Sequence, residues 1–394
     1  MNGTYEIYRR NRTTGIREEL IQRFTSFSLT LNWGELSKFS ISGATVDEVE
    51  LQPQDGLCFY RNGVLIFSGI VEEIEISCTD TAANLKKWTA SGSEDSVIFS
   101  HWLAFADPSA VTFADGVTDK QKGYAYNRLR YYVLYNMGDR ALASRQLEGL
   151  TVTGNQMKGA DTYSAPRFQN LDQVLQEIGD ESGQMYARFV WDPDTGAKSV
   201  VIDEQRDMTA SITVAPEFGN ILDWKKVQSV PTCNAVWVVS ADYESGGQDV
   251  RLYIFKKDED SIAKYGRMEK VVTASEIKVG TYDGKTTTQS EAEQLLTNRA
   301  YEELEAGAYK QKFSGTMVET PQLRFMDDWR CGDLVTCVID GESFSTTIKT
   351  VEVEFSDNFE RVKPTLGEHE KGIFAEVFKG LTGLDTRMKQ EELS

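Results

Sequence analysis

A segment with two glycines and a lysine, Gly280–Thr286, has residue types that bind phosphate groups in nucleotide-binding loops. Such a loop needs four residues between its glycines, so that its backbone N–H groups can surround the phosphates. Here three residues separate Gly280 from Gly284, and Val279 stands where the first glycine belongs. The spacing therefore predicts a Tyr-Asp-Gly-Lys turn between two secondary-structure elements rather than a nucleotide site.

Three aspartates, Asp192, Asp194 and Asp203, suggest a calcium-binding loop, because closely spaced carboxylates can surround that ion. Such a loop also needs an acidic or amide ligand at its fifth position and a bidentate glutamate at its twelfth. Gly196 stands at the fifth position, and no glutamate stands at the twelfth. The run from Asp192 to Gly196 is typical of a hairpin turn, in which the Asp side chain bonds its own backbone. We therefore predict a turn without a metal ion.

The remaining acids and histidines do not form a catalytic pattern. Glu72 and Glu73 are adjacent on an expected strand, where neighbouring side chains point to opposite faces, so they cannot flank one glycosidic bond. His101 and His369 are the two histidines of the chain, which excludes a histidine-rich metal site. We interpret His101 as packed and His369 as exposed. The sequence predicts a protein that is not an enzyme and has no cofactor or metal.

The cysteines indicate reduced thiols rather than disulfides or a zinc site. They are Cys58, Cys78, Cys233, Cys331 and Cys337, an odd number without a Cys-x-x-Cys spacing. Cys331 and Cys337 are the one close pair, and strand alternation would place them on the same face. We favour free thiols in a protein made in a cytoplasm.

The charge of the chain excludes two classes of partner. The 394 residues include 42 Lys and Arg against 61 Asp and Glu, which gives a net charge of −19 at pH 7. Nucleic-acid readers and proteins that bind anionic membranes usually carry a surplus of basic residues. No apolar run approaches the length of a membrane span, so we expect none. The polar start, Met1–Gly15, does not have the apolar core of a secretory signal.

The first hundred residues are expected to be β-structure. In Gly56–Phe67, two apolar runs flank Asn62-Gly63, and this dipeptide favours a tight hairpin because both turn positions need positive φ. A further strand, Gly69–Ile76, alternates aliphatic and acidic residues at its end. We expect these strands to form a small antiparallel barrel or sandwich that closes by about residue 105.

The middle of the chain is expected to mix helices with strands. Residues 170–182 have the apolar spacing of a helix, which Asn170 can cap at its start. Residues 122–136 and 288–307 also have apolar faces, and a hairpin is expected over 184–202. The apolar side of the last helix is Ala292, Leu295, Leu296, Ala300 and Leu304.

A second hairpin near the end resembles the first. Leu334–Ile339 leads to a turn at Asp340-Gly341 and a second strand that ends at Phe355. The motif Val351–Val353 lies ten residues after the turn glycine, and Ile74–Ile76 lies eleven residues after its own. The two segments are either a repeated β domain or two generic hairpins with similar chemistry.

The chain ends in an expected amphipathic helix within residues 368–394. Its apolar stripe consists of Ile373, Phe374, Val377, Phe378 and Leu381. No later element follows in the chain to cover this stripe. It either packs back on its own domain or binds another chain, and we favour a partner.

The order of these segments resembles the baseplate and tail-hub proteins of tailed bacteriophages, including the Gp37-like tail proteins of siphophages. The matching segments are, in chain order, Gly56–Gly69, Gly219-Asn220 leading to Asn234–Val239, Asp260–Arg267, the helix 288–307, and Trp329–Val335 with its closing strand to Pro364. The resemblance spans nearly the whole chain.

The resemblance implies a mixed, mainly β fold with an α+β insertion and two similar small β-barrel, tube-like domains. The implied divisions are 1–105 for the first barrel, 106–217 continued by 257–307 for the middle domain, 218–256 with 308–366 for the second barrel, and 367–394 for the C-terminal helix and tail. Three chains with two barrels each would give a ring of pseudo-sixfold symmetry, which matches the hexameric rings of a tail tube.

The implied function is that of a structural hub at the tail tip of the virion. A homotrimeric ring would join a distal tail or tail-tube protein on one side to a tip, fibre or spike protein on the other. DNA would pass through its channel, and we expect acidic residues to line that channel because they repel phosphate. The alternative is a tail-associated enzyme that degrades peptidoglycan or polysaccharide.

Deleting residues 368–394 is expected to leave a folded trimer that fails to recruit its neighbouring tip protein, because the apolar stripe is then missing. Electron microscopy of tails assembled with the truncated chain measures this. Complete tails built from the truncated trimer would contradict the role of the stripe.

Overall fold

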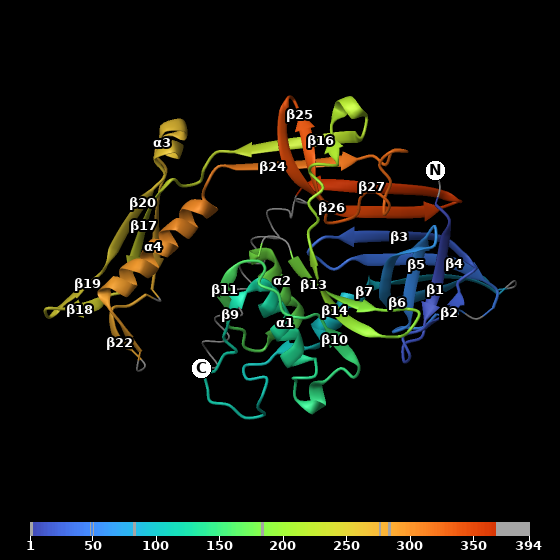
Figure 1. Ribbon diagram of the computed structural model, residues 1–394, viewed down its shortest axis with the longest axis horizontal. Coiled ribbons are helices and arrows are strands. Elements are labelled where there is room, and N and C mark those ends of the chain that lie inside the picture. The colour runs from blue at the N-terminus through green and yellow to red at the C-terminus, as the bar shows by residue number, and fades with distance from the viewer. Residues whose placement is uncertain are drawn as a thin grey trace. The chain divides into compact units, whose positions relative to one another are not determined.

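The computed structural model describes residues 3–47, 49, 51–81, 84–182, 185–275, 277–282 and 285–367, which fold mainly as β-strands with few helices (Figure 1). The expected mainly β class is confirmed. Two compact units can be separated: Lys225–Phe313 forms the smaller one, and the described residues up to Trp224 and from Ser314 onward form the larger one.

Most strands of the larger unit belong to one sheet with a repeated strand order. A first module consists of β1 (Tyr5–Arg10), β3 (Phe24–Asn32), β4 (Lys38–Thr45), β5 (Gly56–Arg61), β6 (Val64–Asp80) and β7 (Leu85–Glu94). These strands pair in the order β1-β5-β6-β7-β4-β3, and β2 (Arg17–Leu20) adds to β1. The bent strand β6 pairs with β5 over its first half and with β7 over its second half.

A second module repeats this order with strands from the other end of the chain. It consists of β15 (Thr213–Val214), β16 (Ile221–Ser229), β24 (Lys310–Met317), β25 (Leu334–Ile339), β26 (Glu342–Ser356) and β27 (Phe359–Gly367). They pair in the order β15-β25-β26-β27-β24-β16. One difference is that β15 runs parallel to β25, whereas β1 runs antiparallel to β5. Residues Ile221–Trp224 of β16 and Ser314–Met317 of β24 belong to the larger unit.

The loops that enter β5 and β25 make the same backbone hydrogen bonds. In each loop, the residue before an aspartate has positive φ, and its backbone N–H donates to a carbonyl of the following long strand, β6 or β26. The N–H of that same strand residue donates to the backbone carbonyl of the aspartate. The bonds are Gln54 N to Val71 O (2.8 Å) and Val71 N to Asp55 O (2.8 Å), matched by Gly332 N to Ile348 O (2.8 Å) and Ile348 N to Asp333 O (2.9 Å). Val71 and Ile348 therefore occupy equivalent positions.

β-bulges explain why the aliphatic-acidic motifs lie at different distances from their turns. Between the turn and the motif, the ladders skip two residues in β6, Ile66 and Glu72, but one residue in β26, Lys349. Glu72 and Lys349 directly follow the equivalent residues Val71 and Ile348, so one bulge is shared, and Ile66 accounts for the extra residue in the first motif. With the common strand order and loop bonds, this favours a repeat over two unrelated hairpins.

The described strands do not close a barrel. Their pairing follows an open path that runs from β16 at one end to β1 and β2 at the other. Within this path the two modules join where β3 pairs with β26, so blue and red strands lie side by side in Figure 1. The expected barrels are therefore not closed by pairing within one chain.

An α/β layer lies between the modules in the chain and belongs to the larger unit. It consists of η1 (Asp95–His101), β8 (Leu103–Ala104), β9 (Gln121–Tyr124), α1 (Ala125–Asn136), η2 (Ala143–Arg145), β10 (Leu150–Val152), β11 (Asp161–Ser164), β12 (Gln169–Asn170), α2 (Leu171–Glu181), β13 (Met185–Trp191) and β14 (Lys198–Glu204). The short η3 (Pro216–Phe218) follows β15. The expected hairpin over 184–202 is present as β13 and β14.

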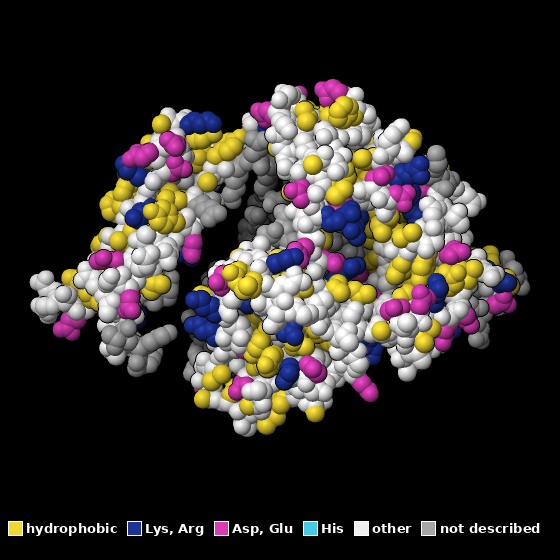
Figure 2. Space-filling view, in the orientation of Figure 1, with side chains coloured by type: hydrophobic (Ala, Val, Ile, Leu, Met, Phe, Trp, Pro, Cys, Tyr) yellow, Lys and Arg dark blue, Asp and Glu magenta, His cyan; other side chains and the backbone are white. Residues whose placement is uncertain are grey.

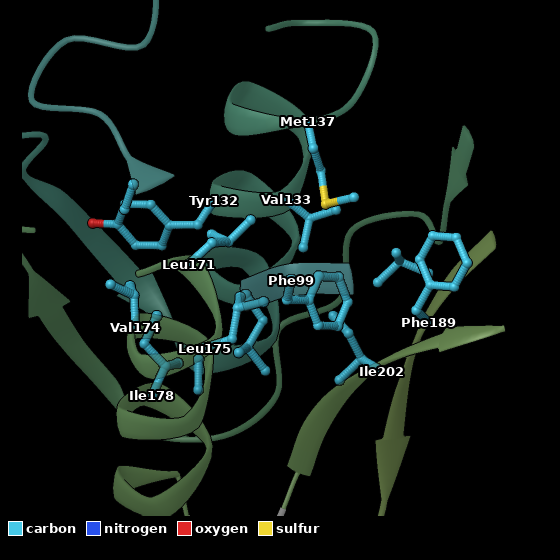
Figure 3. Packing of buried hydrophobic residues seen from close by; sticks show 14 of the residues in the cluster. Phe99, Tyr132, Val133, Met137, Leu171, Val174, Leu175, Ile178, Phe189 and Ile202 are labelled. Carbon is cyan, nitrogen blue, oxygen red and sulfur yellow. The ribbon is translucent and has the colours of Figure 1, made fainter. Parts of the chain in front are cut away.

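The core of this layer forms where the apolar faces of α1 and α2 meet the β13–β14 hairpin (Figure 3). The residues that give 170–182 its helical spacing, such as Leu171 and Leu175, all point into this cluster. Asn170 precedes α2 as expected, but its side chain makes no capping hydrogen bond. The helix is thus held by burial of its apolar face rather than by its cap.

The smaller unit is a separate sheet covered by a helix. It consists of β17 (Ala235–Ser240), β18 (Tyr243–Ser245), β19 (Gln248–Val250), β20 (Tyr253–Lys257), α3 (Glu259–Tyr265), β21 (Glu269–Ala274), β22 (Gly280–Tyr282), β23 (Lys285–Thr287) and α4 (Gln289–Ala306). The apolar face of α4 packs on β17 with Ala292, Leu296 and Ala300, whereas Leu295, expected on the same face, is exposed.

The smaller unit is inserted between two strands of the second module. In the first module five residues join β3 to β4, whereas the equivalent strands β16 and β24 are separated by the unit's sheet and helices. We expected 218–256 to belong to the second barrel, but β17 pairs with β20 and β21 in the smaller unit. The complete set of expected domain boundaries stays a prediction.

The substitutions Gly63→Ala and Gly341→Ala should each lower the free energy of unfolding by roughly 1–2 kcal/mol, because both glycines have φ near 80° in equivalent hairpin turns. No atom lies within 4 Å of an added Cβ at either site, so the cost comes from the backbone alone. Urea unfolding of each variant measures it.

Gly154→Ala is the matched control, since Gly154 also has open space but lacks the left-handed conformation. Its substitution should leave stability nearly unchanged. Equal effects at Gly63, Gly341 and Gly154 would contradict the strained-turn explanation.

Candidate functional site

The interface residues expected from the sequence lie outside the described part of the chain. They are Ile373, Phe374, Val377, Phe378 and Leu381, all within the range 368–394 that the structure does not describe. Their role in binding a partner stays a prediction.

The aspartates of the calcium-like segment serve a turn and ion pairs. Asp192 accepts a hydrogen bond from the backbone N–H of Asp194 at 2.8 Å, and backbone donors of this turn lower the pKa of Asp192. Asp194 pairs with Arg17 at 2.8 Å, and Asp203 pairs with Arg188 at 2.6 Å. The turn interpretation is confirmed. Among the described residues, no group of three or more His, Cys, Asp or Glu is placed to hold a metal ion.

The phosphate-loop-like segment is a hairpin. β22 and β23 pair antiparallel from Gly280 opposite Thr287 to Tyr282 opposite Lys285, as the turn interpretation predicts. Residues 283 and 284 lie outside the described part. In the described residues no helix is long and apolar enough to cross a membrane.

The expectations for His101 and for the Glu72–Glu73 pair need correction, whereas the expectation of free cysteines is confirmed. His101 is exposed at the end of η1 rather than packed. The bulge at Glu72 interrupts strand alternation, so Glu72 and Glu73 do not simply face opposite sides. All five cysteines are free, as expected.

The best-defined site in the larger unit is the seam between the modules, where Ser26–Asn32 of β3 pairs with Thr350–Ser356 of β26. Alternate residues of both strands point into the core, and Leu29 and its partner Val353 are fully buried. Phe27 stacks on its partner Phe355, with ring centroids 5.4 Å apart and an interplanar angle of 10°. Apolar burial and backbone pairing hold the two modules together here.

An ion pair next to the seam also crosses from one module to the other. Arg61 of the first module donates from Nε to Glu360 Oε1 of the second at 2.7 Å, and Tyr5 also donates to Glu360. A second carboxylate, Glu319, lies 3.2 Å from Arg61 Nη2. The side chains of Arg61 and Glu360 are both buried. This site therefore joins residues that are 299 positions apart in the chain.

The pKa of the Glu360 carboxyl reflects two opposed effects. Burial alone would raise this pKa, but hydrogen bonds from Arg61, Tyr5 and the backbone N–H of Gly3 outweigh it and hold the pKa below its ordinary value of 4.5. Burial and the same carboxylate raise the pKa of Tyr5. Glu360 thus stays ionised and Tyr5 stays protonated near neutral pH, which keeps every donor in this network matched to an acceptor.

A cavity of about 860 Å³ in the larger unit is lined by residues of both modules and the α/β layer, among them Trp33, Arg188 and Arg330. Glu94 is in its wall, and burial raises the pKa of this carboxyl to about 7. On the face shown in Figure 2, acidic and basic side chains are interspersed, so the net negative charge is not gathered there.

Comparison with known families identifies the chain. A family model described as Siphovirus ReqiPepy6 Gp37-like protein matches residues 5–368. The chain belongs to the siphovirus Gp37-like protein family. A comparison with curated proteins finds no match.

Solved structures of similar fold include three bacterial and prophage tail proteins. The 43 kDa tail protein of prophage MuSo2 from Shewanella oneidensis has a TM-score of 0.54 at 10% identity, over 92% of this chain and 98% of that one. The tail protein from Neisseria meningitidis MC58 has a TM-score of 0.52 at 12% identity, over 92% and 96%. Prophage tail protein gp18 from Listeria monocytogenes EGD-e has 0.50 at 10% identity, over 96% and 99%.

At these identities the similarity shows the fold, and the fold is that of phage tail proteins. The family match and the fold agree, since the family model comes from a siphovirus protein and the solved structures of similar fold are tail proteins. The order of segments in the sequence predicted this family. The Arg61–Glu360 site was not predicted, because an ion pair between distant strands leaves no local pattern in the sequence.

Glu360→Gln is expected to lower the free energy of unfolding by about 3 kcal/mol at pH 7, because it leaves Arg61 buried beside a neutral partner. A carboxyl whose pKa is lowered on folding stabilises the protein above its ordinary pKa, and this stability is lost as the pH falls through the folded value. The gap between wild type and variant should therefore shrink below pH 4.5. Urea unfolding across pH measures it.

The control is Glu319→Gln, which alters the same arginine's more exposed partner and should cost less. A pH-independent gap for Glu360→Gln, or a larger loss for Glu319→Gln, would contradict this account of the site.

Proposed function

We propose that this protein is the structural hub of a phage tail, a homotrimeric ring at the tail tip. The observation that carries the proposal is the repeated strand order of the two modules. Three chains with two equivalent modules each supply six similar units around a threefold axis, as the sixfold repeat of a tail tube requires. In this assembly each module would act as a tube-like domain, with its open sheet completed by neighbours.

The ring would lie between two kinds of tail protein. A distal tail or tail-tube protein would bind the side with sixfold repetition, and a tip, fibre or spike protein would bind the other side. The proposed location is the tail tip of the virion. Family membership and the tail-protein fold support a structural rather than a catalytic role.

The charge of the chain is compatible with a channel for DNA in transit. Three copies multiply the net charge of −19 by three, before counterions screen it. A negative wall repels phosphate, so DNA would pass through the ring without binding to it. We propose that acidic side chains line the channel face of the trimer.

Sedimentation equilibrium or native mass spectrometry of the purified chain tests the oligomeric state. The expected mass is three times the 44.3 kDa of one chain, because six modules are needed to complete the ring. A chain that stays monomeric at all concentrations, or that forms a stable dimer, would contradict the trimeric hub.

A further inference from the structure

A carboxyl group lies at the place where the first module meets the α/β layer. Glu94 is the last residue of β7, and the chain continues from it directly into η1 of the layer. This residue is only partly exposed and belongs to the wall of the cavity of about 860 Å³. Its backbone N–H donates to the carbonyl of Ser37, in the loop between β3 and β4, at 2.9 Å. Glu94 is therefore placed at a contact between two parts of the larger unit.

The guanidinium groups at this junction are already paired with other carboxylates. The charge of Arg188 on β13 acts on Glu94, but its Nε lies 2.6 Å from Asp203. Arg10 of β1 donates to Asp95 from both of its terminal nitrogens, at 2.8 and 2.5 Å. Asp95 also follows Glu94 in the chain and disfavours a second negative charge. Among the described residues, ionised Glu94 thus has a like charge beside it and no ion-pair partner.

Two serine hydroxyls are the uncharged partners of this carboxyl. Ser37 and Ser96 act on Glu94 as hydrogen-bond donors. Each hydroxyl oxygen also accepts a backbone N–H, from Asn32 to Ser37 at 3.1 Å and from Phe189 to Ser96 at 3.2 Å. Through these serines, Glu94 contacts both the β3–β4 loop of the first module and β13 of the α/β layer. A change in its charge therefore acts on both contacts at once.

Burial decides the charge of this carboxyl. It outweighs the two hydroxyls and Arg188, and raises the pKa of Glu94 from 4.5 to about 7. Cys331, in the segment before β25, is also within electrostatic reach, but burial raises the pKa of its thiol to about 12 and keeps it neutral. Arg206 and Asp333 of the cavity wall pair with each other at 2.6 Å. The wall also contains the ionisable residues Glu35, Lys38, Asp172, Tyr186, Glu204 and Arg330.

We propose that Glu94 is a proton-dependent latch between the first module and the α/β layer. With its proton bound, the carboxyl is neutral and stays in contact with Ser37 and Ser96. Without the proton, the carboxylate gains more from water in the cavity than from the two hydroxyls, so it moves away from Asp95 and both contacts loosen. The latch is closed in mildly acidic solution and loosened in mildly alkaline solution. It lies within one chain and does not depend on the proposed ring.

Glu94→Gln tests the latch, because glutamine has the size of the protonated carboxyl and stays neutral at every pH. A carboxyl whose pKa is raised on folding makes stability fall as the pH rises from its ordinary value of 4.5 to the folded value near 7. The urea midpoint of the full-length variant should therefore be close to that of the wild type at pH 5 and higher than it at pH 8.

Glu72→Gln is the matched control. Glu72 is an exposed carboxylate of β6 that accepts a hydrogen bond from Ser93 Oγ, one residue before Glu94, at 2.9 Å. The Glu72→Gln chain should keep the wild-type change in urea midpoint between pH 5 and pH 8, because this carboxylate is open to solvent.

Hydrogen exchange of the full chain, followed by mass spectrometry at pH 6 and pH 8, tests the two contacts locally. After correction for the intrinsic exchange rates, wild-type peptides that contain the N–H groups of Asn32 and Phe189 should exchange faster at pH 8. The same peptides should stay protected in Glu94→Gln. A general change in stability would instead alter exchange throughout the larger unit.

Each measurement can overturn the latch. Parallel urea midpoints for the wild type and Glu94→Gln from pH 5 to pH 8, or an equal effect of Glu72→Gln, would contradict it. Unchanged protection of Asn32 and Phe189 in the wild type would also contradict it, and this result needs no variant, so the test holds even if Glu94→Gln does not fold.

Discussion

The pairing of β3 with β26 is the interaction on which the larger unit depends. A strand edge carries backbone N–H and C=O groups that need partners when the strand is buried. β26 meets this need by pairing with β25 along its first half and with β3 along its second half. Leu29 and Val353 are fully buried because this ladder forms, and the ion pair between Arg61 and Glu360 lies beside it. By pairing with both β25 and β3, strand β26 joins the C-terminal module to the N-terminal one.

The distance along the chain between contacting residues decides what the sequence could and could not predict. Asn62-Gly63 and Asp340-Gly341 fixed both hairpins, since both turns need positive φ, and the apolar spacing of Leu171 to Ile178 fixed α2. These are local constraints. The insertion of the smaller unit between β16 and β24 and the contact between Arg61 and Glu360 depend on residues far apart in the chain, so no window of sequence contains them.

The residue patterns that first suggested binding chemistry turn out to be turns. The calcium-like aspartates form a turn and ion pairs, and the phosphate-loop-like segment is a hairpin, so these patterns reflect turn chemistry. The feature that recurs within the chain is its order of strands, which the two modules share.

The central claim is that six equivalent modules from three chains form one ring. Single-particle cryo-electron microscopy of the purified assembly, processed without imposed symmetry, tests it most directly. The account predicts a threefold ring in which six similar β modules alternate with 60° spacing around an open channel. A particle with one or two copies, or three chains whose second modules lie away from the ring, would contradict it.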